Sequence, residues 1–135
     1  MTTMTMTTEL MILGWTLVLA LVQILLTASL RTTETGLAYN MGPRDAPAPP
    51  MRPVTARMQR AQANLFETLP LFAAAVLVAH VAGREGDLTL WGSYAYLAAR
   101  VLYVPLYAFG VPLVRSLVWG VSLAGIVMLL VAILK

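Results

Sequence analysis

Residues 57–72 read RMQRAQANLFETLPLF, and this stretch decides the fold of the chain. Two arginines, an asparagine and a glutamate stand in it: Arg57, Arg60, Asn64 and Glu67. A mostly apolar run follows them and continues to residue 81. Charged groups this close to a long apolar run are costly in a membrane unless they pair or face a polar interior. The stretch therefore predicts a membrane-spanning helix that carries a polar site.

The composition of the whole chain also indicates a membrane protein. Of its 135 residues 59% are hydrophobic and only 11% are charged, which is about half the charged share of a soluble domain. Because about 20 helical residues cross a hydrocarbon core of roughly 30 Å, the apolar runs predict four spans. We expect an all-α membrane protein with a single domain, residues 1–135, folded as an up-down bundle of four transmembrane helices. The expected spans are about 9–30, 58–82, 88–109 and 112–134.

The connections between these spans predict the orientation of the chain in the membrane. The first, residues 31–56, is arginine-rich and leads through GPRDAPAPPMRP, residues 42–53, whose five prolines favour an extended, semi-rigid loop. Arginine is also present at the start of the fourth span and is rare in the second connection. The positive-inside rule therefore places the first and third connections in the cytoplasm and both termini outside it. Trp91, Tyr94 and Tyr96 are expected as an interfacial aromatic belt at the outer start of the third span.

Several function classes are excluded by the residue counts. The chain has no cysteine, so disulfides and cysteine-based metal sites or nucleophiles are excluded. Its eight methionines are scattered and fit packing better than a metal site, so we expect no metal. The net charge of +3 is explained by membrane orientation, and we expect no nucleic-acid partner.

The polar residues of the second span share one helical face. Arg60, Asn64 and Glu67 are spaced i, i+4 and i+7, which forms a stripe on a helix. Because lipid would leave these charges unpaired, the stripe is expected to face inward in the cytoplasmic half of the bundle. Glu67 is expected to pair with Arg100 or Arg60.

A second stripe runs along the third span. It contains Tyr96, Arg100, Tyr103 and Tyr107, and Arg115 begins the fourth span on the same side of the membrane. Guanidinium groups bind carboxylates and a glutamate binds an ammonium group, so the two stripes fit a flexible anion with an amine, such as the tripeptide glutathione. Arg115, followed by Ser116, is placed to stabilise a thiolate. A purely structural ion pair is an alternative that the spacing leaves open.

The segments RAQANLFETLPLF, residues 60–72, and ARVLYVPLYAFGVPLVRSL, residues 99–117, resemble a known family. It is the MAPEG family, the membrane-associated proteins in eicosanoid and glutathione metabolism, in which an Arg-Ala-x-x-Asn-x-x-Glu-x-x-Pro pattern opens the second transmembrane helix. The resemblance, to a bacterial-type member, implies a homotrimer in the inner membrane. It also implies glutathione as co-substrate, bound between neighbouring subunits on the cytoplasmic side, and a lipophilic small molecule as second substrate.

The resemblance also implies roles for single residues. It implies glutathione binding by Arg60, Asn64, Glu67, Tyr103 and Tyr107, catalysis by Arg115 with Ser116, and a structural buried charge at Arg100. Three departures are visible. The segment from Tyr107 to Arg115, with Pro105 and Pro112 inside or flanking it, does not match the best-known members residue for residue. Thr68 stands where some members carry a tyrosine, and the first connection lacks an adjacent basic pair that some members use near the glutathione carboxylates. Arg31, Arg44 and Arg52 are the residues available to replace that pair.

Three functions follow from these observations. The first is a glutathione-dependent enzyme, a transferase that acts on lipophilic electrophiles, a peroxidase that reduces lipid hydroperoxides, or both. The second is a catalytically silent accessory or scaffold subunit of the same family. The third is a small multidrug-type transporter, which is less favoured because such transporters rely on a glutamate within the first span, where the apolar run of residues 10–30 contains only Gln23.

Overall fold

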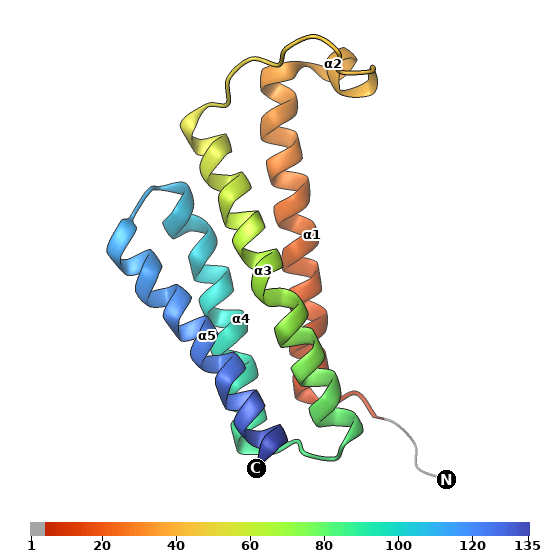
Figure 1. The fold of residues 1–135 in the computed structure, drawn as a ribbon, viewed down its shortest axis with the longest axis vertical. Coiled ribbons are helices and arrows are strands. Elements are labelled where there is room, and N and C mark those ends of the chain that lie inside the picture. The colour runs from red at the N-terminus through yellow and green to blue at the C-terminus, as the bar shows by residue number, and fades with distance from the viewer. Residues whose placement is uncertain (1–4) are drawn as a thin grey trace.

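A computed structural model describes residues 5–135, and this part of the chain is all-helical. Its helices are α1 (Thr8–Thr35), α2 (Leu37–Met41), α3 (Pro53–Val81), α4 (Asp87–Ala108) and α5 (Pro112–Leu134). Figure 1 shows α1 beside α3 and α4 beside α5, with the short α2 at one end. The start of α1 and the end of α5 lie at the opposite end. The end that carries α2 also carries the start of α3 and the α4–α5 turn (Figure 1).

Helix α1 is longer than its apolar run. The side chain of Thr7 accepts a hydrogen bond from the backbone N–H of Leu10 and caps the start, and Gly36 with a φ of 85° ends the helix. Since the apolar run stops at Leu30, the last turn extends beyond it. The connection expected to be extended over 31–56 is therefore partly helical, because α1, α2 and the start of α3 all reach into it.

Helix α3 forms the centre of the core. Leu65, Leu69, Phe72 and Val76 lie along its buried face. The ring of Phe72 stacks on Tyr96 of α4 with 4.1 Å between ring centroids. Tyr96 is completely buried, and its hydroxyl lies 2.8 Å from the Thr68 hydroxyl, within hydrogen-bond distance. The prediction of Tyr96 as an interfacial residue is thus wrong, since the Thr68 hydroxyl gives its phenol a partner inside the core.

Length and composition suit three of the described helices for crossing a membrane: α1, α3 and α5. The 22 residues of α4 are also long enough, at about 33 Å. Its sequence, however, includes Arg100 and several Tyr, Trp, Ser and Gly residues that lower its mean hydropathy. Three of the four predicted spans are therefore both long and apolar enough to cross a membrane, whereas α4 is long enough but less apolar.

Helices α4 and α5 approach each other at two glycines. A Cβ atom added to Gly92 would lie 2.7 Å from the carbonyl oxygen of Gly125, and one added to Gly125 would lie 2.5 Å from that of Gly92. Both distances are too short for a carbon atom in contact with backbone. Small residues at such a crossing let two membrane helices pack backbone to backbone.

Replacing either glycine by alanine is expected to force α4 and α5 apart. We expect Gly92→Ala and Gly125→Ala each to reduce the free energy of unfolding by about 1–3 kcal/mol, the usual cost of overpacking. SDS-induced unfolding in mixed micelles measures this. The control is Gly120→Ala on α5, where an added Cβ meets nothing within 4 Å. Equal stability of the Gly125 and Gly120 variants would contradict the close crossing.

At the end of the molecule opposite α2, two carboxylates hold neighbouring segments together through hydrogen bonds. Glu9 of α1 is 6% exposed and accepts a hydrogen bond from the Thr89 hydroxyl at 2.7 Å. Glu85, in the turn between α3 and α4, accepts one from the Thr7 hydroxyl at 2.7 Å and lies 3.1 Å from Nδ1 of His80. These contacts fasten the start of α1 to the α3–α4 turn.

Candidate functional site

A pocket opens at the α2 end of the molecule, between the start of α3 and the turn that joins α4 to α5. Its volume is about 220 Å³, and its lining residues are Arg57, Arg60, Tyr107, Gly110, Pro112 and Arg115. A second hollow of about 160 Å³ is lined by Asn64, Tyr103, Arg115, Ser116 and Trp119. Because Arg115 lines both, the two hollows are neighbouring parts of one site, which we call the arginine pocket.

Tyr107 is at the centre of the arginine pocket. Its hydroxyl accepts a hydrogen bond from Nε of Arg60 at 3.0 Å. The guanidinium carbons of Arg60 and Arg115 lie 5.7 Å and 4.7 Å from the centroid of its ring, and the ring of Tyr103 meets it edge to face at 5.5 Å. Attraction between a cation and an aromatic face holds both guanidinium groups near the ring. The phenols therefore bring cations of α3 and α5 to the same place.

Arg100 lies behind the pocket and is 1% exposed. Its Nη1 donates to Oδ1 of Asn64 at 2.8 Å, and its guanidinium carbon lies 4.3 Å from the centroid of the Tyr103 ring. Its Nε has no hydrogen-bond partner in the described part of the chain. Asn64 thus both lines the pocket and holds the buried cation.

Glu67 does not form the ion pair expected for it. Among the described residues no cation lies within 4.0 Å of its carboxylate, since Arg100 is held by Asn64 and Arg60 by Tyr107. The Glu67 side chain is exposed on the surface of the protomer and lines neither hollow. The interpretation of Glu67 as an internal partner is therefore wrong for a single protomer.

The remaining predicted site residue, Ser116, is at the edge of the pocket. It is exposed, and its hydroxyl donates to the carbonyl oxygen of Pro112 at 3.1 Å, as expected one turn into a helix. One protomer therefore brings together the predicted residues Arg60, Asn64, Tyr103, Tyr107, Arg115 and Ser116, and leaves Glu67 outside.

Four pocket residues had no role assigned from the sequence: Arg57, Gly110, Pro112 and Trp119. Nη1 of Arg57 donates to the carbonyl oxygen of Ala108 at 3.4 Å, and a Cβ added to Gly110, whose φ is +70°, would lie 3.3 Å from the Arg57 guanidinium carbon. The missing side chain of Gly110 leaves room for this cation against the turn. Trp119 lines the second hollow, and its spacing of four residues from Arg115 could have indicated a shared helix face.

The loop arginines are engaged elsewhere. Arg31 and Arg52 both pair with Glu34, at 2.8 Å and 2.9 Å, and Arg44 donates to the carbonyl oxygen of Asn40 at 3.0 Å. None of the three lines the arginine pocket of the same protomer.

The charge of the pocket determines which ligands it suits. Its lining contains the cations Arg57, Arg60 and Arg115 and no carboxylate. The described residues also contain no cluster of three or more His, Asp or Glu side chains able to hold a metal ion. Guanidinium groups bind carboxylates and stabilise thiolates, so the lining suits an organic anion.

The fold and the site together define a class of protein: a multi-pass, all-helical membrane protein with an arginine-lined pocket at one end of its helices. Within that class the chain belongs to the MAPEG family, whose model matches residues 12–135. The match covers nearly the whole chain and confirms the family predicted from the sequence, a family of membrane proteins of glutathione and eicosanoid metabolism. A search of curated proteins found no match.

Proposed function

We propose that this protein is a glutathione-dependent membrane enzyme. It transfers glutathione to lipophilic electrophiles, reduces lipid hydroperoxides, or does both. The observation that carries the proposal is the contact of Tyr107 with both Arg60 and Arg115, which brings cations from α3 and α5 to one pocket in a chain of the MAPEG family.

In this proposal each part of the pocket acts on one part of glutathione. Arg57 and Arg60 bind its carboxylates, and the phenols of Tyr103 and Tyr107 form the wall against which it lies. Arg115 stabilises the thiolate and thereby lowers the pKa of the glutathione thiol, and Ser116 stands beside it as a hydrogen-bond donor. Because the nucleophile belongs to the substrate, the absence of cysteine from the chain is no obstacle.

The two reactions use the same thiolate. In transfer, its sulfur forms a bond to the electrophilic carbon, and the displaced electron pair leaves with the leaving group or takes up a proton. In peroxide reduction, the sulfur takes the terminal oxygen of the hydroperoxide and releases an alcohol, and a second glutathione then forms the disulfide and releases water. Both second substrates are lipophilic and reach the pocket from the membrane.

The exposed carboxylate of Glu67 supports an oligomer as part of this proposal. A charged group on a lipid-facing surface at this depth is costly unless a polar partner covers it. In the proposed homotrimer a neighbouring subunit covers Glu67, and glutathione binds between the two subunits. The Glu67 carboxylate then accepts the ammonium group of glutathione.

The proposed membrane arrangement includes α4 as the third of four spans in a single-domain, up-down bundle. Its polar side chains face α3 and α5, as Arg100 and Tyr103 do, so that lipid contacts its apolar side. The α2 end lies in the cytoplasm and both termini lie outside it, in a bacterial inner membrane.

Glutathione binding is the first test. For the purified protein in lipid nanodiscs, we expect glutathione to raise Tm, since a ligand at a hundred times its Kd stabilises by about 2.7 kcal/mol. Arg60→Ala is expected to abolish the shift because it removes both a carboxylate-binding group and the contact to Tyr107. The matched control is Arg84→Ala, an arginine at the opposite end of the molecule, which should leave the shift unchanged.

A failure of the wild-type protein to respond to millimolar glutathione would overturn the proposal. Binding without turnover of any electrophile or hydroperoxide would favour the alternative of a catalytically silent accessory subunit. One observation is in keeping with that alternative: Thr68 is turned into the core beside Tyr96 and contributes nothing to the pocket.

A further inference from the structure

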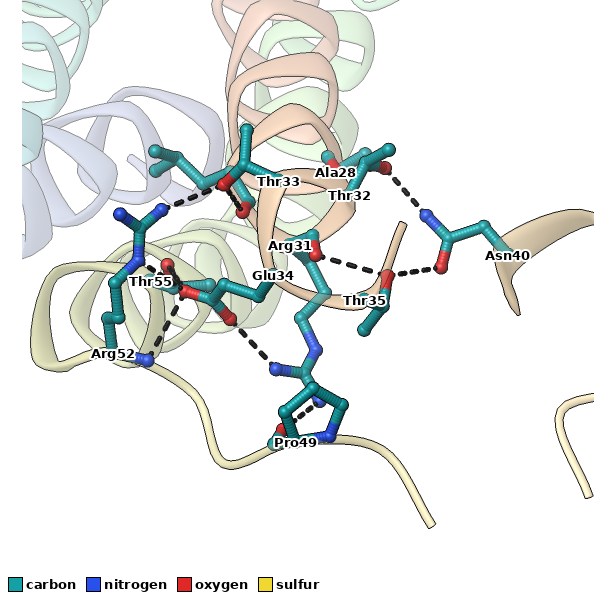
Figure 2. Close-up of polar contacts among 11 residues, drawn as sticks. Ala28, Arg31, Thr32, Thr33, Glu34, Thr35, Asn40, Pro49, Arg52 and Thr55 are labelled. Atoms are coloured by element: carbon teal, nitrogen blue, oxygen red, sulfur yellow. Dashed lines mark hydrogen bonds and ion pairs between the residues drawn. The ribbon is translucent and has the colours of Figure 1, made fainter. Parts of the chain in front are cut away.

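A group of polar contacts around Glu34 joins the end of α1 to the start of α3 (Figure 2). The Glu34 carboxylate accepts hydrogen bonds from Nη1 of Arg31 at 2.8 Å, from Nε of Arg52 at 2.9 Å and from the Thr55 hydroxyl at 2.6 Å. It also accepts one from the backbone N–H of Arg52 at 3.2 Å. We call these four residues, Glu34, Arg31, Arg52 and Thr55, the Glu34 clamp.

The clamp is well shielded from water for a group beyond the apolar run of α1. The Glu34 side chain is 7% exposed, and Thr55 is completely buried. The Thr55 hydroxyl, followed by the guanidinium groups of Arg31 and Arg52, lowers the pKa of Glu34 to about 2. The carboxylate is therefore ionised at neutral pH. Its contribution to stability is fully present above the ordinary glutamate pKa of about 4.3 and is lost progressively as pH falls from there through about 2.

The clamp holds the start of α3, which has no side-chain cap of its own. Arg52 is the N-cap residue of α3, and its side chain makes no capping hydrogen bond to the helix. Instead it donates to Glu34 and, through Nη2, to the Thr33 hydroxyl at 2.8 Å. Arg31 also donates to the carbonyl oxygen of Pro49 at 2.7 Å, so the end of the proline-rich loop is held as well. Hydrogen bonds from Arg52 and Thr55 to side chains of α1 thus hold the first turn of α3 against α1.

The residues just beyond this turn are those of the arginine pocket. Arg57 and Arg60 follow Thr55 on the same helix within two turns. On the far side each makes one hydrogen bond, Arg57 to Ala108 at 3.4 Å and Arg60 to Tyr107 at 3.0 Å. Because a helix moves as a rigid unit over this length, the position of its first turn sets where both guanidinium groups lie.

We propose that Glu34 is a positioning residue for the arginine pocket: the clamp fixes the first turn of α3 against α1 and so places Arg57 and Arg60 for the anion. The proposal rests on the proposed glutathione binding for its effect on affinity. The effect of the clamp on α3 is independent of any ligand. Glu34 itself is remote from the anion and acts through the helix.

The test uses the full chain in nanodiscs and two measurements. Glu34→Gln removes the charge with little change of shape, and Thr55→Val removes the hydroxyl. Both are expected to raise Kd for glutathione by isothermal titration calorimetry about tenfold, a size typical of residues that orient a binding group from behind. Both are also expected to speed amide hydrogen exchange of residues 53–62. Thr55→Ser restores the hydroxyl and should return both readings toward wild type.

The controls separate positioning from stability. Glu85→Gln makes the same change in a carboxylate at the opposite end and should leave Kd and the exchange of residues 53–62 unaltered. Arg60→Lys should weaken binding because lysine lacks the forked donors of arginine. In that background Glu34→Gln should add little, because the residue that Glu34 positions is already altered. A lower Tm for Glu34→Gln with Kd unchanged would reduce the clamp to a structural role and overturn the proposal.

The two proposals fail in different ways. If wild-type protein binds no glutathione, the proposed function is wrong, and hydrogen exchange alone decides whether the clamp fixes α3. If glutathione binds and exchange of residues 53–62 in Glu34→Gln equals that of wild type, the positioning role is wrong and the proposed function stands.

Discussion

Replacing Arg115 by alanine is expected to lower kcat for glutathione transfer by about a hundredfold, the usual effect of removing one group that stabilises developing or resident negative charge. KM for glutathione is expected to change much less, since in the proposed complex Arg57 and Arg60 bind the carboxylates. The ultraviolet absorbance of bound glutathione thiolate should disappear at neutral pH. The rate should recover partly at high pH, where glutathione ionises without help.

Two further variants sharpen this result. Arg115→Lys keeps the charge and should retain part of the thiolate signal, although a lysine does not reproduce the planar contact with the Tyr107 ring. Ser116→Ala tests the neighbouring hydroxyl, whose present bond is to the Pro112 carbonyl, and should have the smaller effect. If Arg115→Ala kept full thiolate absorbance at neutral pH, Arg115 would have no part in activating the thiol.

Replacing Asn64 by leucine is expected to have the largest effect on stability among the pocket variants. Among residues 5–135, the substitution removes the only oxygen that accepts a hydrogen bond from the guanidinium of Arg100, which is 1% exposed. A buried cation without its acceptor carries its full desolvation cost, so the free energy of unfolding should fall by about 3 kcal/mol. SDS-induced unfolding in mixed micelles measures the loss.

The matched comparison is the loss of the cation itself. Arg100→Met removes the buried charge together with its need for an acceptor and should cost about 1 kcal/mol or less. In the double variant the Asn64→Leu substitution should therefore be much less harmful than alone. If the stability lost in the double variant equalled the sum of the losses in the two single variants, the Asn64–Arg100 contact would contribute nothing specific.

The polar stripe of α3 illustrates how far the sequence alone could lead. Helical spacing predicted that Arg60 and Asn64 share a face with each other, and the structure brings both to a pocket with Tyr103 and Tyr107. Three residues further on, the same spacing continues to Glu67, whose side chain is exposed. Spacing predicts which residues share a helix face, but not how much of that face is buried. Glu67, at the end of the stripe, was therefore wrongly placed inside the protomer.

Two errors came from contacts that lie far apart in the sequence. Tyr96 was predicted at the membrane interface from its position near a helix start, but the Thr68 hydroxyl, 28 residues earlier, lets its phenol be buried. The first connection was predicted as an extended loop over residues 31–56. Residues 42–52 contain no helix, as their prolines predict, but α1, α2 and α3 occupy most of the rest, and Glu34 holds the ends of α1 and α3 together. No local pattern reports such partners, because they depend on how helices pack.

The two ends of the protomer differ in charge, and this gives the molecule an electric dipole along its helices. The α2 end carries Arg31, Arg44, Arg52, Arg57, Arg60 and Arg115 against two acidic residues, while at the other end Glu9, Glu85 and Asp87 outnumber Arg84 and Lys135. An inside-negative membrane potential acts on each full charge with about 2.3 kcal/mol per 100 mV. It therefore favours the arginine-rich end on the negative side. In the proposed homotrimer, with its axis along the membrane normal, these dipoles are parallel and add, and the membrane potential then favours the same side for every pocket.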